Sequence, residues 1–398
     1  MLLASALFPR LRMTVGIALL ALMLPLSVRA EGGAAPTHVY TGTIGKQPVV
    51  MKLTHDGDAP TLQGQYFYAK FRFDLPLSGR EEKNGHVSLT EDDNQDGTHQ
   101  SQIDLDRQGD GSLRGQWTSG NGKVLPVVLT PATLPGTAPA DDYLVMLEHK
   151  DLYEYLRLAG LKLQDGKRVV FMGHTLQWRV EPVSHITFPV VEDGYPDAQR
   201  ETINRVLRAR LWQEVSGYFD CMSGGKLSSG GSVEQTVTPS LMNDRVISLD
   251  ITTDSFCGGA HPDVDSAPLT LDVRDGRALT LEDVLWVGAG KPMRFHSAEP
   301  GGDPGSDFDA LDAYRQHYLA PWLLQQLTAL DPATFKKTDD DCPLAEADTW
   351  TFPVWLLTPK GMSVTPTLPH AIESCTNTWI LPWSVLRAHP GVVAGIVP

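Results

Sequence analysis

Positive charge is scarce in this chain. Its 398 residues include 33 Lys and Arg against 48 Asp and Glu, which gives a formal net charge of −15. A protein that binds nucleic acid needs a basic face to neutralise phosphates, so this balance argues against a nucleic-acid partner. The excess of acid instead favours a basic partner through long-range electrostatic steering, although solubility alone would also account for it.

Long apolar runs are equally scarce, and the one that stands out lies near the N-terminus. Arg10 and Arg12 precede an uncharged apolar run, Val15–Leu26, and a small-residue cleavage pattern ends at Ala30. A basic start, a short apolar run and a small-residue site are typical of a secretory signal peptide. We therefore predict that residues 1–30 are an export signal, with a buried N-terminal helix as the alternative.

Export sets expectations for the mature protein. The apolar run is about a dozen residues, short of the roughly 20 that span a bilayer, so we expect a periplasmic or secreted protein without a stable membrane anchor. Met13 is an alternative start from which the signal would still work. Removing residues 1–30 removes three Arg and no acid, which leaves 30 basic and 48 acidic side chains and a net charge of −18.

Cysteine is rare as well, with four in the chain and no CxxC pair. A zinc site or thioredoxin-like chemistry therefore has little support. In an exported chain four cysteines suggest two disulfides, for which the sequence allows three pairings. We favour Cys221 with Cys257 and Cys342 with Cys375, because each pair closes a loop inside one local module.

Short runs of alternating apolar and polar residues fill the segment 36–130. Turn sequences such as Lys83-Asn84-Gly85 separate these runs, as in an antiparallel meander. We predict an all-β domain over 36–130, either a small barrel or a sandwich, followed by a linker over 131–145. The predicted strands are His38–Thr43, Gln47–Leu53, Leu62–Tyr68, Phe71–Leu77, His86–Leu89, Gln102–Leu105, Ser112–Trp117 and Val124–Leu129.

Helical and strand patterns alternate over residues 146–398. A helix is expected after Pro196, and Asp307–Leu330 reads as a second helix that Pro321 should kink or split. Thr280 resembles a helix N-cap with an acidic residue, Asp283, at the third helical position. We predict an α+β domain with an antiparallel or mixed sheet and helices on one face.

Three blocks in the C-terminal half resemble an extracytoplasmic domain family of unknown function. This family is found in the lysozyme-sensing bacterial anti-sigma factor and in peptidoglycan deacetylases. The resemblance covers roughly residues 180–390 and does not extend to the β-domain. The blocks are Ile186-Thr-Phe-Pro189 with Ile203-Asn204, Gly258-Gly-Ala-His-Pro262 with Leu271-Asp-Val-Arg-Asp-Gly-Arg-Ala-Leu-Thr-Leu-Glu-Asp-Val-Leu285, and Pro369-His-Ala-Ile-Glu-Ser-Cys375 with Ile380-Leu-Pro-Trp383.

The resemblance implies a domain that binds a protein and catalyses nothing itself, with no cofactor. Lysozyme is the partner of its best-known member, and lysozyme-type hydrolases are commonly basic. The leading hypothesis is therefore an inhibitor or sensor-like module that binds a basic cell-wall hydrolase. The resemblance carries over no individual contact residue, and no transmembrane signalling.

The stretch CGGAHPDVD, from Cys257 to Asp265, suggests two alternatives. In an extended conformation His261, Asp263 and Asp265 share one face and offer one nitrogen and two oxygen ligands to a divalent ion, to which His370 and Glu373 would add a second pair. Such a site would activate water, as in a metal-dependent hydrolase. No HExxH, GxSxG or SxxK motif supports an enzyme, and glycine and proline already account for a tight turn whose Asp side chains cap backbone amides. We favour the structural or binding turn.

Two weaker candidates complete the set. Asp339-Asp-Asp341 fits a solvated turn better than a calcium site. In the β-domain five aromatic residues alternate along two expected strands, so one face of the domain would suit an apolar ligand or a glycan in a passive envelope-binding protein. Side chains usually fill small barrels, which favours core packing instead. These aromatic residues are Tyr66, Phe67, Tyr68, Phe71 and Phe73.

Overall fold

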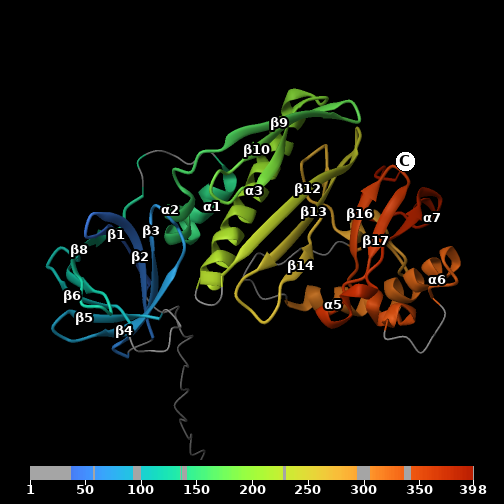
Figure 1. The fold of residues 1–398 in the computed structure, drawn as a ribbon. Helices are drawn as coiled ribbons and strands as arrows, with labels where there is room; N and C mark the ends of the chain where they lie inside the picture. Colours follow the sequence, from blue (N-terminus) through green and yellow to red (C-terminus); the bar gives the residue numbers. More distant parts are fainter. Residues whose placement is uncertain are drawn as a thin grey trace, which may run out of the picture. The chain divides into compact units, whose positions relative to one another are not determined.

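The structure is a computed structural model, in which residues 36–398 form one compact unit. It describes residues 37–56, 59–92, 100–134, 136, 141–226, 230–293, 305–335 and 342–397. The predicted signal peptide and the turn Asp339-Asp-Asp341 lie outside these ranges. The content is α+β as predicted, with an antiparallel β-barrel followed by further antiparallel sheets and several helices (Figure 1).

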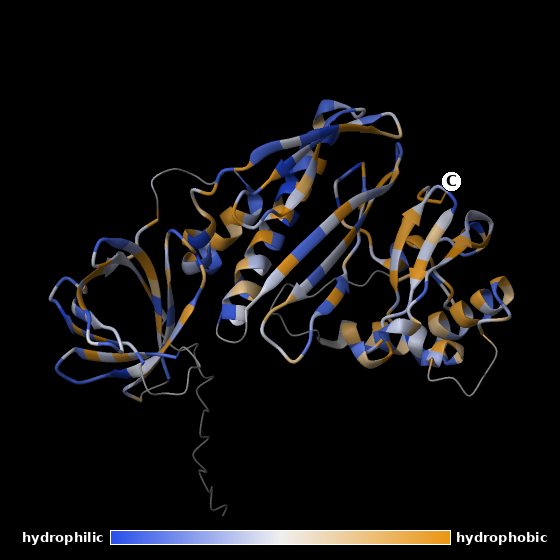
Figure 2. Cartoon of the chain, viewed as in Figure 1, coloured by the Kyte–Doolittle hydropathy of each residue, from blue (hydrophilic) through white to orange (hydrophobic). Residues whose placement is uncertain are grey.

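Eight antiparallel strands in chain order close into a barrel, because β1 pairs with both β2 and β8. Of the two predicted alternatives, barrel and sandwich, the barrel is the one observed. Apolar and polar residues alternate along the strands, as the colours of Figure 2 show, and buried apolar side chains form the core of the barrel. The strands are β1 (Thr37–Ile44), β2 (Gln47–His55), β3 (Thr61–Tyr68), β4 (Leu75–Glu81), β5 (His86–Glu91), β6 (Gln102–Arg107), β7 (Leu113–Thr118) and β8 (Val124–Pro131).

The aromatic residues of the barrel do not share a face, which corrects the idea of an aromatic-lined ligand surface. Tyr66 is part of the interior core, whereas its neighbour Phe67 packs outside it against Tyr153. Phe71 lies in the β3–β4 connection and is 49% exposed. The alternation breaks there because Arg72 adopts a left-handed backbone with φ of 62°, and β4 starts only at Leu75.

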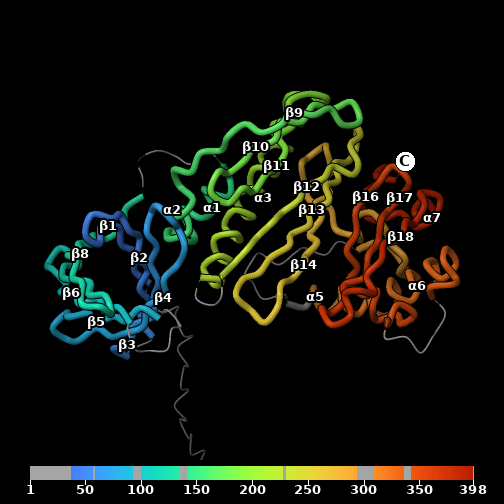
Figure 3. Tube along the Cα trace, viewed as in Figure 1, coloured from blue at the N-terminus to red at the C-terminus, as the bar shows by residue number. Residues whose placement is uncertain are grey.

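The chain then forms two short helices, a three-stranded sheet, a long helix and a second sheet. Figure 3 traces these segments, with α3 alongside the second sheet. β13 is central in that sheet, since it pairs with β12, β14 and β15. The elements are α1 (Asp142–Lys150), α2 (Leu152–Leu158), β9 (Gln164–Phe171), β10 (His174–Val180), β11 (Thr187–Asp193), α3 (Asp197–Lys226), β12 (Ser232–Met242), β13 (Val246–Phe256), β14 (Asp263–Ser266) and β15 (Leu269–Asp272).

A second hydrophobic core gathers the remaining elements around a third sheet of order β16-β17-β18. Thr280 caps α4 in a capping box with Asp283, as predicted. The predicted helix 307–330 is interrupted by a π-helical turn just before Pro321, which lacks the N–H that a regular turn would use. The elements are α4 (Leu281–Val284), α5 (Gly305–Tyr314), the π-turn η1 (Arg315–Leu319), α6 (Ala320–Leu330), the 3₁₀ turns η2 (Pro343–Ala345), η3 (Ala347–Trp350) and η4 (His370–Cys375), β16 (Val354–Thr358), β17 (Gly361–Thr365), β18 (Trp379–Pro382) and α7 (Trp383–Ala388).

The structure contains both predicted disulfides, Cys221–Cys257 and Cys342–Cys375. The first ties the last turns of α3 to the end of β13, and the second joins the two segments that flank the β16–β17 hairpin. Two disulfides and no free cysteine point to an oxidising, extracytoplasmic compartment.

Within the described ranges, none of the helices is long and apolar enough to cross a membrane.

We expect removal of the first disulfide to lower the free energy of unfolding by about 3–4 kcal/mol, because its 36-residue loop then regains its conformational entropy in the unfolded chain. The double variant Cys221→Ser/Cys257→Ser should be compared with wild type by urea unfolding without reductant. The second pair, which closes a 33-residue loop, is the matched control and should cost a similar amount. A loss below about 1 kcal/mol for the first pair alone would contradict the entropic account.

Candidate functional site

The predicted site residues lie on the loop after β13 and on β14. Cys257 follows β13 directly, and its disulfide anchors the start of the loop. His261 is exposed in the loop, and Asp263 and Asp265 are exposed on β14, opposite Ser255 and Thr253 of β13. Since they alternate with Val264 along the strand, the two carboxylates share one face.

The structure also brings the second predicted pair to this place. The rings of His261 and His370 stack in parallel, with centroids 3.9 Å apart and an interplanar angle of 3°. Nδ1 of His370 lies 3.0 Å from Oε2 of Glu373, and Nδ1 of His261 lies 2.9 Å from the carbonyl oxygen of Pro262. The stack therefore connects the loop after β13 with η4, which the second disulfide anchors at Cys375.

This geometry gives the metal-hydrolase alternative no support. Stacked parallel rings direct their nitrogen lone pairs side by side, whereas a zinc ion needs ligands that converge on one point at about 2.0–2.2 Å. In the described parts of the chain, no three His, Cys, Asp or Glu side chains are placed to hold a metal ion. What the residues form is an exposed, disulfide-anchored surface, which we call the β14 edge and define as His261–Asp265 with His370 and Glu373.

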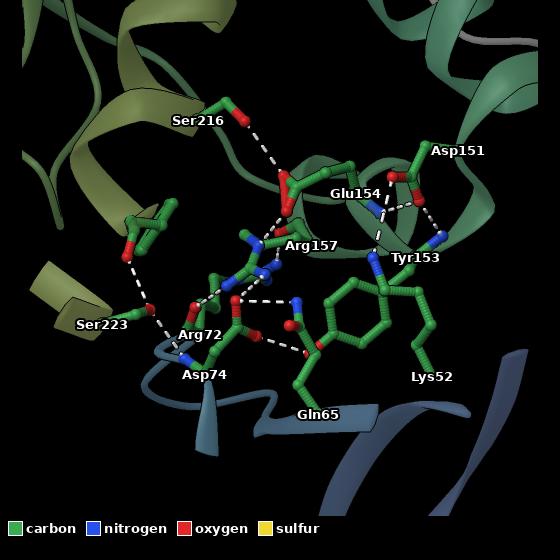
Figure 4. Close-up of polar contacts among 11 residues, drawn as sticks. Lys52, Gln65, Arg72, Asp74, Asp151, Tyr153, Glu154, Arg157, Ser216 and Ser223 are labelled. Carbon is green, nitrogen blue, oxygen red and sulfur yellow. Dashed lines mark hydrogen bonds and ion pairs between the residues drawn. The ribbon is translucent and has the colours of Figure 1, made fainter. Parts of the chain in front are cut away.

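Sequence reasoning missed a buried polar cluster, which lies where the barrel contacts α2 (Figure 4). Its centre is Arg157 on α2, whose side chain is 0% exposed. Nη2 of Arg157 lies 2.7 Å from Oδ2 of Asp74, and Nε lies 2.6 Å from Oε1 of Glu154. Arg157 also donates to the carbonyl of Arg72, whose guanidinium donates in return to the carbonyl of Arg157.

A second layer of hydrogen bonds surrounds this ion pair. Oδ1 of Asp74 accepts from the Tyr153 hydroxyl at 2.5 Å, and Oδ2 accepts from Nε2 of Gln65 at 3.1 Å. The backbone N–H of Asp74 donates to Oγ of Ser223 on α3, and Oγ of Ser216 donates to Glu154. The cluster thus joins the barrel, α2 and α3. A buried polar network stabilises such a junction only when its members have hydrogen-bond partners.

The charges in this cluster perturb one another. Burial opposes the charge on Arg157, but Glu154 and Asp74 outweigh it and raise the pKa of the guanidinium. Burial raises the pKa of Glu154, although Arg157 counteracts part of that shift. Burial and the Asp74 carboxylate raise the pKa of the Tyr153 hydroxyl. With its partners inside the chain, the cluster acts as an internal connection rather than as a site for a ligand.

Comparison with known proteins adds little information about the function of this chain. No family model matches the chain, and no curated protein matches it. Among solved structures, a crystal structure of a member of the DUF3298 family from Bacteroides fragilis is similar, with a TM-score of 0.34 and 14% sequence identity. The similarity covers 58% of this chain and 94% of that one. So distant a match carries no argument about function.

Two isosteric substitutions beside Arg157 should differ sharply. Asp74→Asn places an amide against the donors of Arg157, Tyr153 and Gln65, and we expect it to cost about 3–5 kcal/mol. Glu154→Gln retains an acceptor for Arg157 and Ser216, and should cost less than about 1 kcal/mol at pH 7. Urea unfolding measures both.

The pH dependence of the stability tests the protonation of Glu154. The pKa of Glu154 is higher in the folded protein than in the unfolded chain. The stabilisation that protonated Glu154 provides is therefore complete below the unfolded-state pKa, and it is lost as the pH rises through the folded-state pKa. The stability of Glu154→Gln relative to wild type should therefore increase as the pH is raised from about 4 to 8. A relative stability that falls with rising pH would show that the ionised carboxylate is favoured here.

The histidine stack should contribute a small coupling energy. In a double-mutant cycle with His261→Ala and His370→Ala, we expect a coupling of about 0.5 kcal/mol, the lower limit for an aromatic pair, because both rings are exposed. EDTA is the control and should leave wild-type stability unchanged. A large EDTA effect together with stoichiometric bound metal would return the hydrolase alternative.

Proposed function

We propose that this protein is an exported binding protein of the cell envelope, periplasmic or secreted, whose partner is a basic cell-wall hydrolase of lysozyme type. Three features support the proposal. The C-terminal half resembles a domain family whose best-known member binds lysozyme, the mature chain has a net charge of −18 after loss of three Arg, and two disulfides fit an oxidising compartment.

The β14 edge carries the proposal. The exposed carboxylates of Asp263 and Asp265 lie on one face of β14, and Val264, which is 49% exposed, lies on the other face. Neither carboxylate makes an ion pair in the described parts of the chain, so both charges remain available to a basic partner. Two carboxylates on one face of the strand give this surface electrostatic complementarity to a basic partner.

The surroundings of this edge hold it in place before binding. One disulfide anchors the loop at Cys257, the other anchors η4 at Cys375, and the stack of His261 on His370 joins the two. A surface that is ordered in advance loses less conformational entropy when a partner binds. We infer that the β14 edge blocks the hydrolase sterically, with its carboxylates against cationic residues near the cleft.

The test measures binding and peptidoglycan hydrolysis with the full mature chain and several muramidases at about 0.15 M salt. We expect saturable binding, inhibition, and association that slows as salt shortens the screening length from about 10 Å to 3 Å. Asp263→Asn/Asp265→Asn should weaken binding about tenfold, mainly through the association rate.

The control variant removes the same charge elsewhere. Asp193→Asn/Glu201→Gln changes two exposed acids outside the β14 edge, and its affinity should stay within about twofold of wild type. Equal losses in both variants would reduce the interaction to non-specific attraction. Absence of saturable binding and inhibition across the muramidases would refute the proposal.

A further inference from the structure

An open pocket of about 330 Å³ is lined by the segment after α4 and by the face of α5 that continues into the π-turn η1. Two of its lining residues, Trp286 and Tyr314, are buried, and their rings stack in parallel with centroids 4.2 Å apart. The ring of Tyr318 lies 6.2 Å from that of Tyr314 at an angle of 22°, and Tyr318 is 50% exposed. The pocket therefore has two aromatic rings at its floor and a third at its rim.

Small residues leave room in front of these rings. Ala310 and Ala313 on α5 line the pocket and are exposed. In the segment after α4, a Cβ atom at Gly288 would lie 2.7 Å from Cζ2 of Trp286 and 2.9 Å from Cε2 of Tyr314. Only glycine fits at this position unless the rings move, so the backbone itself packs against the floor of the pocket.

The π-turn supplies the polar groups of the rim. His317 and Tyr318 both belong to η1, line the pocket and are exposed. Nδ1 of His317 lies 2.8 Å from the carbonyl oxygen of Ala313, to which it can only donate, so Nε2 is the acceptor of the neutral ring. The rim thus offers an imidazole acceptor and a phenolic hydroxyl. π-Helical turns often occur at functional sites.

Charge is missing from the lining. Among the described residues that line the pocket, none is Asp, Glu, Lys or Arg. Arg315 belongs to η1, but its Nε lies 2.8 Å from Oε1 of Glu282, so its charge is already paired. A charged ligand would lose solvation here without gaining an ion-pair partner, which favours a neutral ligand.

We propose that this pocket binds one pyranose ring of a neutral glycan that carries N-acetylated amino sugars. A pyranose combines an apolar face of C–H groups with an edge of hydroxyls, which matches aromatic rings below a polar rim. The acetamido group adds a methyl group for Met293 and an N–H donor for His317. A purely aromatic ligand would leave the polar groups of the rim without partners.

This inference does not rest on the proposed function, because the pocket shares no residue with the β14 edge. A protein partner at that edge and a glycan in this pocket are separate ligands, and each is tested without the other.

The binding experiment uses the full mature chain and N,N′-diacetylchitobiose, with the indole N–H signal of Trp286 in NMR spectra as the readout. The variant Trp286→Phe assigns this signal, because its spectrum lacks it. We expect a saturable shift at millimolar sugar. Cellobiose has the same linkage without acetamido groups, and should bind about tenfold more weakly because it lacks the methyl and N–H contacts. Absence of a saturable shift would refute the inference and would leave hydrolase binding at the β14 edge unaffected.

Two further probes test the class of ligand. Phenol presents an aromatic face without an edge of hydroxyls, and should bind more weakly than diacetylchitobiose. The disaccharide of N-acetylglucosamine and N-acetylmuramic acid adds a lactyl carboxylate, which distinguishes peptidoglycan from a chitin-type glycan as the source. Its affinity should be equal or lower, because the described lining offers no cation. Tighter binding of phenol or of the carboxylate-bearing sugar would overturn the assignment.

Substitutions in the pocket place the sugar. Ala313→Leu fills the pocket from α5 with a residue of similar helix propensity, and should abolish saturable binding while the Tm is unchanged. Ala329→Leu, at an exposed position of α6 outside the pocket, is the matched control and should retain wild-type affinity. Tyr318→Phe keeps the ring but removes the hydroxyl, and should lower affinity about fivefold through the lost hydrogen bond. Full affinity in Ala313→Leu, or equal losses in Ala313→Leu and Ala329→Leu, would overturn the inference.

Discussion

The burial of one guanidinium is the constraint on which the arrangement of the barrel and the following helices depends. Arg157 is fully buried, so its charge needs a buried carboxylate, which Asp74 provides, while Glu154 on the same helix provides a further hydrogen-bond acceptor. Asp74 belongs to the β3–β4 connection and is itself bonded to Ser223 of α3. The pair is satisfied only when these segments meet, and we infer that folding of the barrel and docking of α2 and α3 are mutually dependent.

Features that depend on neighbouring residues were predictable. Alternation located the eight barrel strands, and Thr280 with Asp283 identified a capping box. Short loop length selected the disulfide pairing that the structure contains. The start of β4 was misplaced because the left-handed backbone of Arg72 is a local conformation that the apolar pattern does not encode.

Features that depend on residues far apart in the sequence could not be predicted from the sequence. Asp74 and Arg157 are 83 positions apart, and nothing in either local pattern distinguishes a buried ion pair from two solvated charges. His261 and His370 were each noted as metal-ligand candidates, yet only the three-dimensional structure shows their rings stacked face to face.

Closure of the barrel also bears on where copies of the chain could aggregate. The pairing of β1 with β8 leaves no open edge among the described barrel strands, so these strands offer no template for strand exchange between copies once they have folded. The later sheets do end in open strands, and β12 is eleven residues long. Intermolecular aggregation should therefore begin in the C-terminal half, where the Cys221–Cys257 bond limits how far β13 can separate from α3.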